Sequence, residues 1–241
     1  MAETSYDQIA AWYDACIRRD SPVSLFIREQ LLRIVGAPKG QQICDLACGQ
    51  GQLARELAGQ GASVVGVDLS ADLIAIARRD EQAEPLGISY LVDDAQTLSR
   101  LEGDLFDGLI CNMALMDIPD LAATYQAIHR VLRAGGWFAF SITHPCFQSP
   151  HAQWIPSDDG TVSRRIVTYF EEGFWRSGNP DGVRGKVGAY HRTLSSYLNG
   201  LIRTGFDLAR IVEPRGAGPI LDRVPGYAVA PAFMMIRCQK R

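Results

Sequence analysis

Apolar positions between residues 41 and 142 fall into two alternating patterns. Short, almost continuous apolar runs are typical of buried strands, and they occur at 43–47, 62–67, 88–92, 106–111 and 137–142. Stretches with helical spacing separate most of these runs, at 51–58, 70–77 and 121–132. This alternation is typical of a parallel sheet with helices on both faces. The pattern therefore predicts a doubly wound α/β core over residues 41–142.

The chain before this core has a helical pattern. Apolar side chains recur at helical spacing between residues 5 and 19, namely Ile9, Trp12, Tyr13 and Ile17. Ser21 followed by Pro22 predicts the start of a second helix, and Gly36 is a plausible end for it. We therefore expect residues 1–40 to form an N-terminal helical cap.

Residues 143–190 break the alternation. They are rich in proline, glycine and aromatic residues, and only 165–170 is strand-like. A connection this long inside an α/β domain usually carries function. We therefore interpret residues 143–190 as a lid, or substrate-binding insertion. The helix predicted at 193–202 and the strands predicted at 206–212 and 232–238 would complete the core, so we assign residues 191–241 to it.

The composition is that of an ordinary globular protein, with 47% hydrophobic and 21% charged residues in a chain of 241. A formal net charge of −3 gives no electrostatic footprint for nucleic acid. The six cysteines show no paired metal-ligand spacing, so we expect no metal site and a reducing compartment. We find no signal peptide and no membrane-spanning apolar run, and we expect a cytoplasmic protein with a small-molecule substrate and no membrane partner. The sequence does not predict an oligomeric state.

The most informative stretch is the turn at Gly49 and Gly51, between the first predicted strand and its helix. Glycines allow a tight turn, and they allow the backbone to approach a nucleotide-like ligand closely. Ligands of doubly wound sheets lie beyond the carboxyl ends of the strands. Acidic or amide side chains stand at those ends in this chain, at Asp45, Asp68, Asp94 and Asn112. The pattern predicts a nucleotide-like ligand at this edge of the sheet.

Two classes of cofactor fit the turn. Gly49–Ala54 satisfies the G-x-G-x-x-G/A fingerprint of NAD(P)-dependent oxidoreductases. Asp45, however, would repel a pyrophosphate and would suit a cationic amino or sulfonium group. Asp94 lies where an adenine amino group could be bound. These two acids favour a sulfonium cofactor, although a nicotinamide cofactor stays an alternative.

Taken together, the motifs resemble the class I S-adenosylmethionine-dependent methyltransferases, in their small-molecule, methyltransferase type 11-like branch. The resemblance is carried by five segments in order, Ile43–Gly51, Val65–Ser70, Asp93–Ala95, Phe106–Ile110 and Arg130–Gly136. It implies a Rossmann-like, mostly parallel sheet of seven strands whose last strand is antiparallel. It also implies methyl transfer from S-adenosyl-L-methionine, with S-adenosyl-L-homocysteine as the product.

The resemblance assigns roles to residues of this chain. Gly49 and Gly51 would lie against the methionyl and ribose parts of the cofactor, and Asp45 near its amino group. Asp68 would hold the ribose hydroxyls. Further cofactor-binding positions are Tyr13, Ala47, Leu69, Asp94, Ala95 and Asn112.

Methyl transfer needs alignment of the acceptor, and a general base only where the acceptor must lose a proton. His144 after the fifth strand and His191 after the lid are the candidate bases. Aromatic side chains that could contact a flat or hydrophobic acceptor are Tyr13, Phe147, Tyr169 and Trp175. A protein that binds S-adenosylmethionine without transferring a methyl group is a further alternative.

Overall fold

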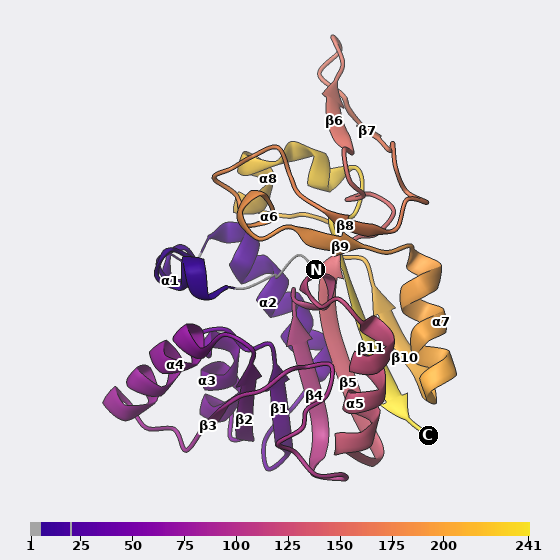
Figure 1. The fold of residues 1–241 in the computed structure, drawn as a ribbon. Helices are drawn as coiled ribbons and strands as arrows, with labels where there is room; N and C mark the ends of the chain where they lie inside the picture. The colour runs from indigo at the N-terminus through magenta and orange to yellow at the C-terminus, as the bar shows by residue number, and fades with distance from the viewer. Residues whose placement is uncertain (1–5, 20) are drawn as a thin grey trace.

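A seven-stranded sheet forms the centre of the protein, with the strand order β10-β11-β5-β4-β1-β2-β3. The computed structural model describes residues 6–19 and 21–241 (Figure 1). Five neighbouring strands pair in parallel, β1 (Gln42–Leu46), β2 (Ser63–Asp68), β3 (Ser89–Val92), β4 (Phe106–Asn112) and β5 (Leu132–Thr143). The last strand, β11 (Phe233–Lys240), runs antiparallel between β5 and β10 (Phe206–Val212). The predicted mostly parallel sheet with an antiparallel last strand is confirmed.

Helices cover both faces of the sheet, as the alternation predicted (Figure 1). One core cluster joins α5 (Leu121–Val131) and α7 (Leu194–Thr204) to the strands, with Ile128, Leu201 and Phe138 fully buried. The other cluster joins α2 (Pro22–Val35), α3 (Gln52–Gly59) and α4 (Ala71–Ala83) to the opposite face. The shorter helices are η1 (Asp7–Ile9), α1 (Ala10–Arg18), η2 (Leu115–Asp117), α6 (Val183–Lys186), α8 (Pro219–Arg223) and η3 (Pro225–Ala228).

Side-chain caps fix where the longer helices begin. The Ser21 hydroxyl accepts from the Ser24 amide, and Pro22 occupies the first helical position as predicted. Ser70 caps α4 in the same way, because its hydroxyl accepts from the Leu73 amide at 3.2 Å. Each such cap satisfies one of the free N–H groups of the first turn and stabilises its helix by about 1 kcal/mol.

The lid differs from its prediction. Two antiparallel pairs form within it, β6 (Gln153–Pro156) with β7 (Val162–Arg165) and β8 (Gly173–Trp175) with β9 (Ala189–His191). The hairpin of β6 and β7 projects from the body of the protein (Figure 1). The predicted strand at 165–170 is wrong, because pairing ends at Arg165 and Ile166 and Val167 are exposed. His191, which directly follows the predicted lid, ends β9, and Thr193 caps α7.

Gly108 in β4 leaves room for the ring of Trp137 on the neighbouring strand. A Cβ built on Gly108 would stand 2.1 Å from two carbon atoms of this ring. The indole Nε1 donates to the Gln41 side chain at 2.9 Å, and this bond holds the ring in place. The ring therefore fills the space that a side chain at Gly108 would need.

We expect Gly108→Ala to lower the free energy of unfolding by about 1–3 kcal/mol, because overpacking forces the ring or the backbone to move. Gly178→Ala is the matched control, since nothing lies within 4 Å of a Cβ built there. Urea unfolding of both variants measures the difference. Equal stability of the two variants would show that the ring yields without cost.

Candidate functional site

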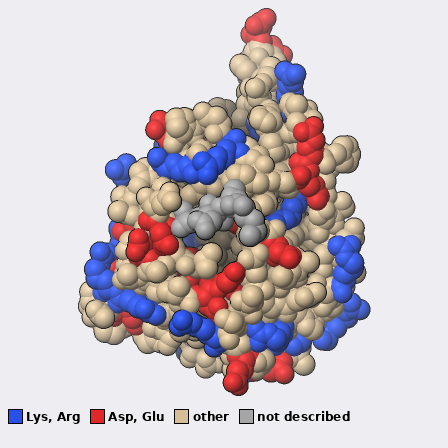
Figure 2. All heavy atoms as spheres, viewed as in Figure 1, with Lys and Arg blue, Asp and Glu red and all other residues tan. Residues whose placement is uncertain are grey.

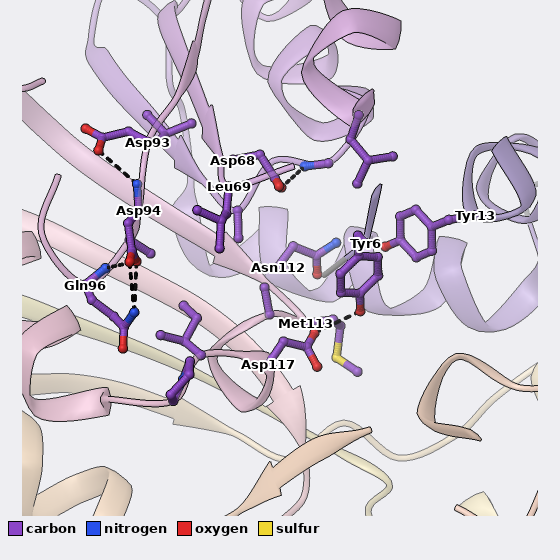
Figure 3. A pocket seen from close by; sticks show the side chains of 18 residues that line it. Tyr6, Tyr13, Asp68, Leu69, Asp93, Asp94, Gln96, Asn112, Met113 and Asp117 are labelled. Atoms are coloured by element: carbon purple, nitrogen blue, oxygen red, sulfur yellow. Dashed lines mark hydrogen bonds between the residues drawn. The ribbon is translucent and has the colours of Figure 1, made fainter. Parts of the chain in front are cut away.

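A cavity lies at the carboxyl ends of β1, β2 and β4, and we name it the edge cavity (Figure 3). Eight of the predicted cofactor-binding residues line it, namely Tyr13, Ala47, Gly49, Asp68, Leu69, Asp94, Ala95 and Asn112. In Figure 3, Asp94 and Gln96 lie at one end, Tyr6 and Tyr13 lie at the other, and Asp68 and Leu69 lie between them. The cavity is therefore elongated along the edge of the sheet. The fold brings together side chains that the sequence places at the ends of different strands.

Every second residue of the turn after β1, from Ala47 to Gly51, has a left-handed backbone. Ala47 has φ 53°, Gly49 has φ 57° and Gly51 has φ 84°. A left-handed alanine is strained by about 1 kcal/mol, so Ala47 accepts a conformation that glycine adopts freely. A Cβ on Gly51 would meet the Tyr90 hydroxyl oxygen at 2.4 Å. Gly51 is thus required for packing against Tyr90, and it is not among the residues that line the edge cavity.

The carboxylate of Asp68 joins this turn to the end of β2. One of its oxygens accepts from the Gly49 amide at 2.7 Å, and the other accepts from the Ser70 amide at 2.8 Å. Burial raises the pKa of Asp68 to about 6, although the two amide bonds oppose this shift. Asp68 faces the edge cavity while it holds the turn in place.

The other end of the edge cavity is built by the loop after β3. Asp94 accepts from the backbone and side-chain nitrogens of Gln96, at 2.8 and 3.1 Å to one oxygen. Leu69 is 61% exposed, which is unusual for so large an apolar side chain beside a cavity. An apolar surface next to a carboxylate suits a planar, polar-edged ring such as a purine. Leu69 and Asp94 both line the edge cavity, and their roles beside an adenine stay a prediction.

Asp45 is a buried acid with an unsatisfied oxygen. It is 1% exposed, and its Oδ2 atom has no hydrogen-bond partner among the residues that the structure describes. Burial, and then the charge of Asp68, raise the pKa of Asp45 to about 8. Asp45 lines a second cavity, which we name the turn cavity and which shares Tyr13, Gly49 and Asn112 with the edge cavity. A buried, unsatisfied carboxylate fits a ligand that presents an ammonium group.

Sequence reasoning missed three residues that close the site. The Tyr6 hydroxyl donates to Asp117 at 3.0 Å, and the Arg184 guanidinium donates to the same carboxylate (Figure 3 labels Tyr6 and Asp117). Tyr6 packs edge-on against Tyr13, with ring centroids 5.1 Å apart. Asp117 follows β4 near Asn112, so its position at the edge could have been noticed. No local pattern points to Tyr6 or Arg184.

A third cavity, of about 140 Å³, lies under the lid, and we name it the lid cavity. Its walls come from η2, the end of β5, the lid and α7. Two of the predicted acceptor and base residues, Trp175 and His191, belong to these walls. Arg184 lines both the lid cavity and the turn cavity. The lid cavity and the turn cavity therefore lie on either side of one shared side chain, that of Arg184.

His144 lies at the start of the lid and lines none of the three cavities, although its neighbours Thr143 and Pro145 line the lid cavity. Its Nδ1 accepts from the Cys146 amide at 3.2 Å, so its Nε2 carries the proton and donates to Glu213 at 2.6 Å. Burial lowers the pKa of His144, which favours this neutral form. Since both ring nitrogens are engaged, this position disfavours His144 as a general base.

Phe147 and Tyr169 also lie apart from the lining of the lid cavity. Phe147 packs on the His144 ring, with centroids 4.9 Å apart. The Tyr169 hydroxyl accepts from the Leu194 amide at 3.0 Å, and the Tyr169 carbonyl accepts from His191 Nε2 at 2.7 Å. Tyr169 therefore connects the lid to the segment that follows it, while Phe147 packs within the lid. The structure does not place them against an acceptor in this cavity.

Charge is unevenly distributed between the cavities. Four acids line the edge cavity, Asp68, Asp93, Asp94 and Asp117. Figure 2 shows acidic atoms near the middle of the face that it presents, with basic side chains spread around them.

Within residues 6–19 and 21–241, no group of His, Cys, Asp and Glu could hold a metal ion. No helix in the same ranges is long and apolar enough to cross a membrane.

Comparisons with known proteins agree with this geometry. A family model described as a methyltransferase domain matches residues 44–140. The ubiquinone biosynthesis O-methyltransferases of Thiobacillus denitrificans and Coxiella burnetii are 33% and 31% identical to this chain over 42% and 54% of its length. The chain spans about half the length of these curated relatives, 44% and 53%.

Solved structures extend the likeness beyond the core. A S-adenosylmethionine dependent methyltransferase from Mesorhizobium loti has a TM-score of 0.75 at 29% identity, over 88% of this chain and 96% of that one. The [4+2]-cyclase SpnF has a TM-score of 0.59 at 17% identity, over 84% of this chain and 76% of that one, which shows the fold alone. In fold, and in the sequence of residues 44–140, the chain is similar to the class I S-adenosylmethionine-dependent methyltransferases. This similarity implies S-adenosylmethionine as the cofactor.

The buried acid predicts how stability depends on pH. Because the pKa of Asp45 is about 8 when folded and about 3.9 when unfolded, the folded state binds more protons between these values. The free energy of unfolding of the ligand-free protein should therefore fall as pH rises from about 4 to about 8. Asp45→Asn should weaken this dependence.

Urea unfolding at several pH values, without cofactor, measures the effect. The difference between the two slopes reports the titration of Asp45 together with its coupling to Asp68. Parallel pH profiles for the wild type and Asp45→Asn would contradict the raised pKa.

Proposed function

We propose that this protein transfers a methyl group from S-adenosyl-L-methionine to a small aromatic acceptor and releases S-adenosyl-L-homocysteine. The observation that carries the proposal is Asp45, whose buried and unsatisfied carboxylate stands beside the glycine turn. A pyrophosphate has no N–H donor or positive charge to offer this carboxyl group, whereas the cofactor's ammonium group would pair with its ionised form and satisfy it. Bound S-adenosylmethionine supplies a sulfonium methyl group, which is already an activated electrophile.

The residues of the edge and turn cavities would hold the cofactor along the sheet. Asp68 would accept from the ribose hydroxyls, while Leu69 and the Ala95 amide face the adenine. Asp94 would accept from the adenine amino group. The positions proposed to contact the methionyl part are Tyr13, Asp45, Ala47, Gly49 and Asn112. In this proposal Gly51 acts through the shape of the turn.

The lid cavity would hold the acceptor. Trp175 and Tyr190 supply aromatic surface, and about 140 Å³ is the size of a cavity that takes one six-membered ring. The family match ends at residue 140, before the lid, so the names of the relatives carry little weight for the acceptor. The main work of the chain would be to align the acceptor and to exclude water.

His191 is the better placed of the two candidate bases. It lines the lid cavity, and because its Nε2 donates to the Tyr169 carbonyl, its Nδ1 is the nitrogen that accepts a proton. If it is the base, His191→Ala should lower turnover about 10²–10⁴-fold with little change in cofactor affinity. His144→Ala should chiefly lower stability, because it breaks the bond to Glu213.

The rate of methyl transfer to an acceptor and the thermal unfolding of both variants separate these two effects. Full turnover in both variants would show that the enzyme works by positioning alone.

The cofactor assignment predicts the effect of removing Asp68. Asp68→Ala loses charge-assisted bonds of about 1.5–3 kcal/mol, so its affinity for S-adenosylhomocysteine should fall about ten- to a hundredfold. Asp72→Ala is the matched control, since Asp72 is exposed and does not line the edge cavity. Calorimetric titration measures both variants, and unchanged affinity in Asp68→Ala would refute the ribose contact.

Two alternatives have distinct outcomes. Tighter binding of NADH than of S-adenosylhomocysteine would favour an oxidoreductase. Cofactor binding without methyl transfer to a broad panel of acceptors would favour a protein that has kept the site for other chemistry. The likeness in fold to a [4+2]-cyclase makes the second alternative concrete, although it concerns the fold alone.

A further inference from the structure

The lid cavity is lined by hydrogen-bond donors and cationic side chains. Its polar lining comprises Thr143, Gln148, Arg184, Tyr190, His191, Arg192 and Tyr197. No carboxylate side chain belongs to its lining within the part of the chain that the structure describes. The cavity therefore differs in sign of charge from the edge cavity, and its lining favours a ligand that accepts hydrogen bonds.

One of the two arginines is already committed to the backbone. Arg192 donates to the carbonyl oxygens of Leu115, Ile118 and Pro119, at 2.6 to 3.1 Å. These bonds hold η2 and the segment after it, which includes Asp117. Arg192 thus supports the wall of the cavity, and three of its five N–H donors are engaged in doing so.

Arg184 has donors to spare. Its Nη1 donates to Asp117 and to the Gly188 carbonyl, the latter at 3.2 Å. Its Nε and Nη2 have no hydrogen-bond partner among residues 6–19 and 21–241. The side chain is 21% exposed, and it lines the turn cavity as well as the lid cavity. A guanidinium held on one side by a carboxylate and open on another is well suited to bind an anionic oxygen.

Gln148 supplies a second, independent donor. Its Oε1 accepts from Arg164 at 2.9 Å, and since a guanidinium can only donate, this bond fixes the orientation of the amide. Its Nε2 is buried and has no hydrogen-bond partner in the described part of the chain. A buried N–H group without a partner costs stability, which a ligand oxygen would recover.

We infer that the acceptor carries a carboxylate, which Arg184 and Gln148 bind inside the lid cavity. This inference rests on the proposed function, because it concerns the acceptor of that reaction. A buried carboxylate requires a paired charge and hydrogen bonds to both oxygens, and these two side chains offer both. Trp175 and Tyr190 leave room for one ring beside it, so an aromatic carboxylate is the class of ligand that the cavity fits.

Benzoate and benzamide are the matched probes, because they share a ring and differ in charge. Binding is measured by calorimetric titration and by saturation-transfer NMR, with and without S-adenosylhomocysteine. We expect the wild type to bind benzoate at least about tenfold more tightly than benzamide. Arg184→Met should remove this preference. Arg176→Met should keep it, since Arg176 is an exposed lid residue that stacks on Phe174 and does not line the cavity.

Gln148→Glu provides a test that does not depend on the ion pair with Asp117. The new carboxylate can keep the bond from Arg164 and places a negative charge where the amide donor was. We expect this variant to lose benzoate binding about tenfold or more, while its affinity for S-adenosylhomocysteine stays that of the wild type.

The outcomes separate this inference from the proposed function. Equal or weaker binding of benzoate than of benzamide by the wild type would overturn the inference, as would a preference that survives in Arg184→Met or Gln148→Glu. Failure of S-adenosylhomocysteine to bind would overturn the proposed function instead. The titrations without that ligand would still report on the carboxylate site.

Discussion

The carboxylate of Asp68 is the interaction on which the site depends most. It accepts from Gly49 in the turn after β1 and from Ser70 at the start of α4. β1 and β2 are neighbouring parallel strands, and Leu46 pairs with Val67, so their carboxyl ends reach the same level. One side chain can therefore hold both loops. Since Asp68 also lines the edge cavity, the shape of the turn and the affinity for a ligand are coupled.

The sheet supplies only one side of the site, and segments far apart in the sequence supply the other. Tyr6 from the N-terminal cap and Arg184 from the lid both donate to Asp117, which follows β4. These contacts join residues 111 and 67 positions apart in the chain. A single buried carboxylate thus fastens two covering segments to the rigid sheet. Loss of either contact would leave a buried carboxylate with one partner fewer, which is costly.

The cavities differ in the charge of their linings. Acids surround the edge cavity and Asp45 stands at the turn, while arginines and a neutral amide donor line the lid cavity. Under the proposed roles, a cationic cofactor would face acids and an anionic acceptor would face donors. Arg184 lies at the junction of the turn and lid cavities. Under the proposed roles, the positive charge of Arg184 would therefore lie close to both the cofactor and the acceptor.

The sequence by itself determined the sheet, most helix starts and the residues at the strand ends. Apolar runs, the caps Ser21 and Ser70, and the acids Asp45, Asp68 and Asp94 are local signals, and parallel strands necessarily bring their carboxyl ends to one edge. The tertiary structure alone decided the strands of the lid, the meeting of Tyr6 and Arg184 at Asp117, and the engaged position of His144. These features depend on contacts between distant segments, which no local periodicity encodes. The lid is where this limit matters most, because its apolar residues contact different parts of the protein rather than one repeating face.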